Sequence, residues 1–427
     1  MGRFRPTTKA QVSGHRFLWR RVEHGLVMKD IRMIHDPLVG RRRALIFGTV
    51  AVVMVAVGAG VLAWLQPNPR PGDAPIVRTA GDQLLVRVDG TYHPVANLTS
   101  ARLIAGEPSQ PAAVGRDALA VANFGPPLGI ADAPGFLAET ANANSSAASE
   151  WAVCRDHREE DPSAAATVVR AGDPERPSVP LGDDRAALVQ EMGGDQWLIT
   201  SRGRTRLPGA EDPLGRAVRR GLDIDTPGAA AAGVWEVPSE FLNAFAEQPE
   251  FALPDPLPEV WNAEDGTQWA RSVDGVAELS DAEARVLAAA GAPTREARTT
   301  EVAALGDVPL PPTHLPPRVP RLVGTTEGWL CAAADGGAEL SPAVGAVELS
   351  GTAIADRFAG LNEGAVVVDT GHSLHLVSPT GQRHLVPEPA ALEALGVTIS
   401  GTAPWEIVRL LPEGSSLDRD SALRVTY

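Results

Sequence analysis

The sequence predicts an α+β fold in which one transmembrane helix near the N-terminus precedes a body of small hairpin-helix units. Three observations lead to this fold class. Residues 44–65 are apolar and carry no charged side chain. After them, a pattern of two β-rich runs around a glycine turn occurs four times. The chain has 427 residues with 42 Gly and 37 Pro, so it needs more than one core and its elements are short.

The apolar run from Ala44 to Leu65 predicts a membrane-spanning helix. Its 22 residues, at about 1.5 Å each, reach about 33 Å and can cross a hydrocarbon layer of about 30 Å. The run follows directly on Arg41, Arg42 and Arg43, so the positive-inside rule places the N-terminus in the cytoplasm and the body outside. The alternative is a cleaved signal peptide, but the 43 residues before the run exceed the leading region of one. We therefore expect an uncleaved anchor.

Charge is divided unevenly along the chain. Residues 1–43 hold eleven Lys and Arg against three Asp and Glu, a net charge of +8. Since the whole chain carries -15, the remaining residues carry -23. A basic end before an acidic body is typical of a contact with a membrane or with nucleic acid at that end. The acidic body disfavours nucleic acid as a partner, because phosphate binding requires positive charge.

The basic arm, residues 1–43, predicts an amphipathic helix. Apolar residues fall near one stripe at helical spacing, with the charged side chains off it. Two interpretations stay open. The helix could lie on the anionic inner leaflet of the membrane. It could also dock partner subunits through four apolar residues of the stripe: Phe17, Leu18, Val22 and Leu26.

Four hairpins are predicted in the body, each with a glycine whose positive φ suits a tight turn. The turns lie 113, 72 and 106 residues apart, which excludes a solenoid of fixed period: Gly90, Gly203, Gly275 and Gly381. The first and third hairpins are followed by helical segments of similar sequence, at 101–105 and 284–288. The second and fourth are followed by similar tripeptides, Trp235-Glu236-Val237 and Trp405-Glu406-Ile407. The pattern indicates four small α/β units with approximate two-fold symmetry.

The chain has two cysteines, Cys154 and Cys331. This number excludes a disulfide-dense scaffold and a four-cysteine zinc site. Outside the cytoplasm we expect the two to pair, closing a loop of 177 residues. The alternative is a pair of separate buried thiols.

Signals for catalysis are weak. A P-loop requires a lysine in a glycine-rich turn, and the only two lysines, Lys9 and Lys29, lie in no such turn. The run Asp369-Thr370-Gly371 is similar to the aspartic protease motif, but it occurs once where that chemistry needs two carboxylates, so we expect a strand and a turn. No carboxylate falls at a metal-ligand spacing from His372 and His375, and His93 is expected to be structural. The sequence thus predicts no catalytic, cofactor-binding or metal-binding residue.

Residues on both sides of the apolar run follow a known pattern. The run is preceded by Thr7-Thr8-Lys9-Ala10-Gln11-Val12-Ser13-Gly14-His15-Arg16-Phe17 and followed by His93-Pro94-Val95-Ala96-Asn97-Leu98-Thr99-Ser100-Ala101-Arg102-Leu103. A third matching segment is Gly129-Ile130-Ala131-Asp132-Ala133-Pro134. Together with the single span, these segments resemble the EccB family, a membrane component of the type VII (ESX) secretion machinery of actinobacteria. The sequence departs from the family at Gly25, where alanine is usual, and in its Ala-rich middle.

The resemblance implies a body of four repeat domains around a central β-rich domain. We expect the following boundaries: a cytoplasmic arm at 1–43, the span at 44–65, a linker at 66–75, repeat 1 at 76–135, the central domain at 136–185 and 309–370, repeat 2 at 186–258, repeat 3 at 259–308 and repeat 4 at 371–427.

The resemblance also implies a function. It predicts a structural subunit of the ESX core complex, anchored once in the cell inner membrane, with the body in the periplasm. Expected partners are an EccC-type motor ATPase, an EccD-type multi-span channel protein, an EccE-type subunit and further copies of this chain. Two alternatives stay open. One is an extracytoplasmic nucleotide hydrolase, since ATP hydrolysis has been proposed for the family, and the other is a cell-wall-binding module.

Overall fold

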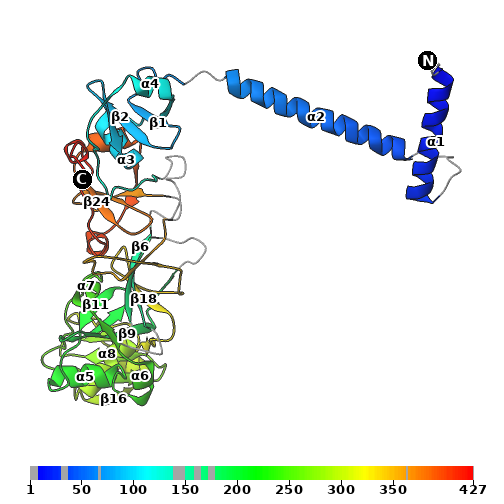
Figure 1. Ribbon diagram of the computed structural model, residues 1–427. Coiled ribbons are helices and arrows are strands. Elements are labelled where there is room, and N and C mark those ends of the chain that lie inside the picture. Colours follow the sequence, from blue (N-terminus) through cyan, green and yellow to red (C-terminus); the bar gives the residue numbers. More distant parts are fainter. Residues whose placement is uncertain are drawn as a thin grey trace, which may run out of the picture. The chain divides into compact units, whose positions relative to one another are not determined.

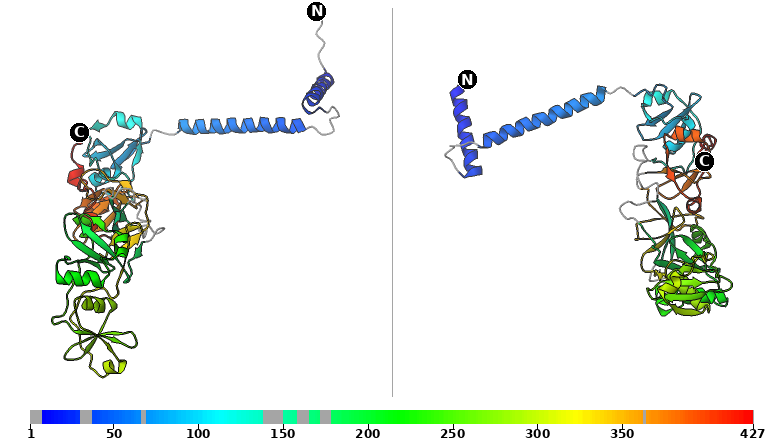
Figure 2. Two further views of the ribbon diagram at one scale, coloured as in Figure 1. Left: turned by 90° about the horizontal axis from the view of Figure 1, so that it is seen from below. Right: turned by 180° about the vertical axis from the view of Figure 1, so that it is seen from behind.

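The computed structural model describes residues 8–29, 37–65, 69–137, 150–157, 165–171, 178–361 and 364–426 (Figures 1 and 2). Residues 66–68 of the expected linker therefore lie outside the described part of the chain, as do residues 1–7 and 30–36 of the arm. The chain divides into two compact units. One comprises residues 1–70 with 115–118, and the other comprises residues 71–114 with 119–427.

The first unit contains two long helices. Helix α1 spans Lys9–Met28 and helix α2 spans Pro37–Leu65. The proline at the start of α2 suits the first helical position, where no backbone N–H is required. Within α2, Arg43–Leu62 is long and apolar enough to cross a membrane, by length and composition. The observed helix thus includes the whole run expected to span.

The second unit begins with a five-stranded sheet, called here the first sheet. Its strand order is β4-β1-β2-β3-β5. The hairpin turn lies at Asp89 and Gly90, which both have positive φ as a tight turn requires. The strands and the helix that follows the hairpin are β1 Ile76–Thr79, β2 Leu84–Val88, β3 Thr91–Val95, α3 Leu98–Ala105, β4 Ala112–Val114 and β5 Asn123–Phe124. Helix α4, Arg116–Ala120, lies between β4 and β5 in sequence, and most of it belongs to the first unit.

Three further sheets follow the same outline of three antiparallel strands, a helix and a last strand parallel to the first. The second sheet contains β9 Arg185–Glu191, β10 Gln196–Thr200, β11 Gly203–Arg206 and β12 Trp235–Val237, with α5 Pro213–Gly221, α6 Pro227–Ala232 and α7 Ser239–Leu242. The third contains β13 Glu259–Ala263, β14 Gln268–Arg271, β15 Val276–Leu279 and β16 Thr294–Ala297, with α8 Asp281–Ala289 and α9 Thr299–Ala303. The fourth contains β22 Val366–Asp369, β23 Leu374–Val377, β24 Arg383–Val386 and β25 Ile399–Thr402, with α10 Pro389–Leu395, α11 Trp405–Val408 and α12 Arg419–Ala422.

Each of the four predicted hairpins is present, as β2–β3, β10–β11, β14–β15 and β23–β24. The strand before each hairpin was not part of the prediction. In the fourth sheet this strand is β22, so the sheet begins before the boundary expected at residue 371.

A seven-stranded sheet joins segments that are far apart in sequence. Its order is β20-β21-β7-β6-β18-β19-β8. Every residue of β6 and β7 is buried, so both faces of the sheet are covered at its centre. The strands are β6 Trp151–Asp156, β7 Ala166–Ala171, β8 Val179–Pro180, β18 Trp329–Ala333, β19 Ala338–Ser341, β20 Val347–Glu348 and β21 Arg357–Ala359, while β17 Arg321–Leu322 pairs with β9 instead.

Shared cores join the sheets in pairs. One core combines the first and fourth sheets, and Arg102 of α3 donates to the Leu395 carbonyl oxygen at 2.8 Å across this boundary. Another combines the second and third sheets, where Arg285 pairs with Asp223 at 2.7 Å. A third core joins the second, fourth and seven-stranded sheets, and Figure 1 shows β6 and β18 between β24 and β9. The first sheet thus shares a core with the fourth sheet, whereas its sequence similarity is to the third.

Candidate functional site

Helix α1 presents an exposed apolar stripe. The helix begins after Thr8, whose backbone N–H donates to the Gln11 side chain at 3.0 Å. Residues four apart lie on one helix face. Leu18, Val22 and Leu26 follow this spacing and are 60%, 56% and 77% exposed. They form a continuous apolar surface that no described residue covers.

Two details of this stripe differ from the expectation. Phe17 lies five residues before Val22 and is therefore rotated by about 140° from it, onto the side of Arg20 and Arg21. Phe17 thus lies off the stripe of Leu18, Val22 and Leu26, and its part in docking stays a prediction. Trp19, at i-3 from Val22 and i-7 from Leu26, does share it and is 68% exposed. The same helical spacing in the sequence could have identified Trp19.

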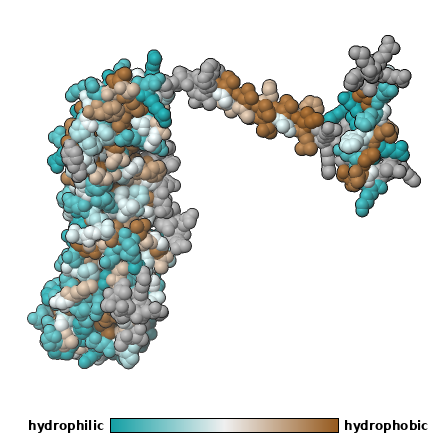
Figure 3. Space-filling view, in the orientation of Figure 1, coloured by the Kyte–Doolittle hydropathy of each residue, from teal (hydrophilic) through white to brown (hydrophobic). Residues whose placement is uncertain are grey.

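Helix α2 is exposed along its apolar length, and Figure 3 shows it as a hydrophobic rod. Arg43 is exposed at the start of the span. The side chains of Arg41 and Arg42 lie outside the described part, so the orientation of the helix rests on the sequence. It is the one helix among the described residues that is long and apolar enough to cross a membrane.

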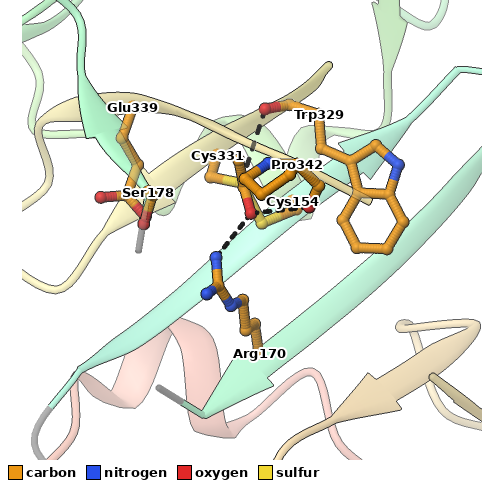
Figure 4. Close-up of a disulfide and its surroundings, with 8 residues drawn as sticks. Cys154, Arg170, Ser178, Trp329, Cys331, Glu339 and Pro342 are labelled. Carbon is orange, nitrogen blue, oxygen red and sulfur yellow. Dashed lines mark hydrogen bonds between the residues drawn. A yellow bond between two sulfur atoms is a disulfide. The ribbon is translucent and has the colours of Figure 1, made fainter. Parts of the chain in front are cut away.

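Cys154 of β6 and Cys331 of β18 form the disulfide that the sequence led us to expect. The two residues lie directly opposite each other on neighbouring antiparallel strands, although 177 residues separate them. Both are fully buried, with Val168 and Trp329 in the same small cluster. Figure 4 shows Trp329 next to the disulfide. The bond therefore ties the two halves of the seven-stranded sheet together.

A pocket of about 350 Å³, lined by both charged and apolar residues, lies beside the disulfide. Arg170 of β7 enters it and donates to the Ser341 hydroxyl. Glu339 of β19 accepts a hydrogen bond from Ser178 at 2.6 Å, and burial raises the pKa of this carboxyl. Glu150 and Asp335 also line the pocket, so its carboxyl groups outnumber its one guanidinium.

The Asp369-Thr370-Gly371 run forms a turn between β22 and β23. One carboxylate oxygen of Asp369 accepts the Gly371 N–H at 2.8 Å, and the Thr370 hydroxyl donates to the Ser373 carbonyl oxygen at 2.9 Å. This carboxylate thus closes a local turn, which is the strand-and-turn interpretation made from the sequence. Among the described residues, no three His, Cys, Asp or Glu side chains could hold a metal ion together.

Two histidines of the body, His375 and His93, make structural contacts. His375 is buried, stacks on Trp405 with ring centroids 5.3 Å apart, and contacts the Ser373 hydroxyl at 2.9 Å. Burial, aided by the nearby Arg383 charge, lowers the pKa of His375 to about 4. His93 donates from Nδ1 to the Pro126 carbonyl oxygen at 2.9 Å. These contacts fix the orientation of both rings.

Comparisons with known proteins agree with these features. The family model described as "Type VII secretion system ESX-1, transport TM domain B" matches residues 4–265 and 325–426. The chain is 29% identical over 466 residues to a Mycobacterium tuberculosis protein named "ESX-1 secretion system ATPase EccB1", covering 98% of this chain and 95% of the relative. A relative of the same name from Mycolicibacterium smegmatis is 29% identical over 476 residues, covering 99% and 96%.

Solved structures share the fold. One chain of "Structure of an intact ESX-5 inner membrane complex, Composite C3 model" has a TM-score of 0.67 and 25% identity, covering 100% of this chain and 97% of that one. A chain of "Structure of EccB3 dimer from the ESX-3 core complex" has a TM-score of 0.66 at 24% identity, covering 82% and 100%. The family match, the full-length relatives and the single apolar helix agree, and the chain belongs to the EccB family of type VII (ESX) secretion systems.

Proposed function

We propose that this chain is a structural subunit of the inner-membrane core complex of a type VII (ESX) secretion system. The observation that carries this proposal is the likeness to a chain of an intact ESX-5 inner membrane complex, which extends over 100% of the present chain. Helix α2 anchors the subunit, and the disulfide-tied body is its rigid part. The exposed stripe on α1 is left for a partner.

The body consists of four copies of one module around the seven-stranded sheet. What supports this is a contact at the start of the third strand of each small sheet. Arg204 accepts from Gln248 N–H at 2.8 Å, and Arg383 accepts from Gly414 N–H at 2.8 Å, each through its backbone carbonyl. The equivalent bonds are Val308 N–H to Val276 at 2.9 Å and Gly125 N–H to Tyr92 at 3.0 Å. The same backbone hydrogen bond in all four sheets is what we expect if the four sheets are copies of one repeated unit.

The arm lies in the cytoplasm and the body in the periplasm. The argument is the charge of +8 before the span and -23 after it, because positive residues flank the cytoplasmic end of a membrane helix. The periplasm is also the compartment in which a disulfide persists.

The partners we propose are the EccC-type motor ATPase, the EccD-type multi-span protein, the EccE-type subunit and a second copy of this chain. The Leu18, Trp19, Val22 and Leu26 stripe docks one of these cytoplasmic or membrane partners, because exposed apolar side chains at helical spacing fit an apolar groove. Self-association is supported by the dimer in which the EccB3 structure was solved.

Affinity purification of the tagged full-length chain from membranes, in mild detergent, tests this function. We expect subunits of the EccC, EccD and EccE types to elute with it in one large complex. Elution of the chain without any ESX subunit would contradict the proposal.

The names of the relatives suggest a second function, hydrolysis of ATP. The chain has no lysine after Lys29. The pocket beside the disulfide is lined by three carboxyl groups and one guanidinium, that of Arg170, so it lacks the excess of positive charge that a triphosphate requires. We therefore expect no ATP turnover by the purified chain and no change in Asp369→Asn, which keeps an oxygen for the turn at Gly371. Turnover that follows the chain through every purification step would favour the enzyme.

A further inference from the structure

The first sheet carries an exposed apolar surface. Val121 is 86% exposed and Phe124 is 54% exposed, and the neighbouring Pro126 and Pro127 are exposed too. No charged residue occurs from Ala118 to Ala131. We call the exposed side chains of Val121 and Phe124, with the two prolines, the apolar patch. Exposed apolar side chains that gather on one surface can mark an interaction site.

The apolar patch is held in place by the sheet. Phe124 belongs to β5, which pairs in parallel with β3 so that Phe124 lies opposite Tyr92. The two rings are in contact, with centroids 6.4 Å apart. The Gly125 N–H donates to the Tyr92 carbonyl oxygen at 3.0 Å, and the Pro126 carbonyl oxygen accepts from His93 at 2.9 Å. These contacts hold Phe124 and Pro126 on the sheet, and both remain exposed there.

The first sheet differs from the rest of the body in net charge. Residues 69–131 hold five Arg and five Asp or Glu, a net charge of zero, so residues 132–427 carry all of the -23. Anionic lipid repels a strongly acidic surface but not a neutral one. Of the sheets in the body, the first is thus the one that can approach an anionic lipid surface without repulsion.

The connection between α2 and the first sheet is short. Helix α2 ends at Leu65 and β1 begins at Ile76, so ten residues connect them. Fully extended, they reach at most about 36 Å. The first sheet is therefore tethered within about one bilayer thickness of the end of the span.

We infer that the apolar patch contacts the lipid surface on the side of the membrane that holds the body. Phe124 and Val121 would enter the headgroup region, where apolar and aromatic side chains are favoured. The contact orients the body on its short tether. The inference rests on α2 as a membrane span but not on any ESX partner, so it can fail while the proposed function holds.

Spin labels at two matched valines test this contact. Val121→Cys places a label in the patch, and Val273→Cys places one on the third sheet, where Val273 is 95% exposed. The native cysteines are paired and buried, so the label reacts at the new cysteine alone. Each full-length variant is inserted into a lipid nanodisc at one copy per disc. Accessibility to oxygen and to a water-soluble nickel complex is then measured.

We expect the label at 121 to lose accessibility to nickel and gain accessibility to oxygen, while the label at 273 stays fully accessible to nickel. The same variants in detergent without lipid are expected to differ much less. Equal nickel accessibility at the two positions in the nanodisc would overturn the inference. Protection at 121 that appears only in discs with two copies, with coupling between the labels, would also overturn it, because the patch would then join two copies.

Discussion

The Nδ1 atom of His384 lies 2.9 Å from the carbonyl oxygen of Ser415. A carbonyl oxygen only accepts, so Nδ1 carries the hydrogen. His93 and Pro126 repeat this relationship at 2.9 Å in the first sheet. In both places the ring packs directly against a glycine, so that a Cβ at Gly414 or Gly125 would collide with it.

This packing predicts that Gly414→Ala destabilises the protein. The added methyl has no room beside the fully buried His384 ring, and overpacking costs about 1 to 3 kcal/mol. Chemical denaturation of the full-length chain in detergent measures the free energy of unfolding. Gly345→Ala is the control, because its Cβ would meet nothing within 4 Å. Equal stability of the two variants would show that the histidine–glycine contact is not tight.

Buried histidines predict a loss of stability in acid. The pKa of His375 is lowered to about 4 in the folded state against 6.5 when unfolded, so the unfolded state binds the proton first. Its contribution is complete above pH 6.5, falls as the pH drops toward 4, and amounts to about 1 to 3 kcal/mol. His384 adds to the effect, since burial lowers its pKa too.

His375→Phe keeps a ring against Trp405 but does not titrate. Its free energy of unfolding is expected to change less between pH 7 and pH 4 than that of the parent protein. Parallel pH profiles of the two proteins would contradict the assignment of the effect to His375.

The disulfide predicts a further change in stability. Replacing Cys154 and Cys331 together by alanine is expected to lower the free energy of unfolding by about 2 to 4 kcal/mol, because the bond closes a 177-residue loop. Thermal unfolding with and without reductant measures this. The double variant should not respond to reductant. A melting temperature equal to that of the oxidised parent would contradict a stabilising role.

The stripe on α1 offers a matched pair of substitutions. Leu18 and Phe17 are neighbours with 60% and 55% exposure but lie on different faces. Leu18→Glu is expected to weaken docking of the partner by about 2 kcal/mol, roughly 30-fold, while Phe17→Glu has little effect. Quantitative mass spectrometry of the co-purified subunits compares them. An equal loss in both variants would show that the stripe is not the docking face.

Local pattern predicted part of this fold. The glycine turns of three hairpins were visible in the sequence because positive φ restricts the residue type, as at Gly90, Gly203 and Gly381. The expectation of a positive φ at Gly275 is wrong, and a glycine stands there because a Cβ would collide with the Gly306 carbonyl oxygen. The strand β22 was assigned to the central domain, since an apolar run such as Val366-Val367-Val368 fits any buried strand. Its parallel pairing with β25 joins residues about thirty positions apart and depends on tertiary packing.

Matching the second and fourth copies by residue type aligned the wrong positions. Trp235 and Trp405 were matched because both precede a glutamate, but Trp235 lies in β12 and Trp405 begins α11. The equivalent positions are the helix caps Pro238 and Pro404. The disulfide was predictable from the compartment and the number of cysteines. The pocket beside it was not, because Arg170 and Glu339 come together only through the pairing of strands in the sheet.

The central claim is that this chain is a structural part of the ESX membrane complex, and deletion with complementation tests it most directly. The gene for this chain is deleted in the source organism. Native electrophoresis of solubilised membranes from the deletion strain then measures the assembly of the remaining ESX subunits. We expect the large complex to disappear and to return with the full-length chain or with Asp369→Asn. A complex of unchanged subunit content and undiminished amount in the deletion strain would contradict the claim.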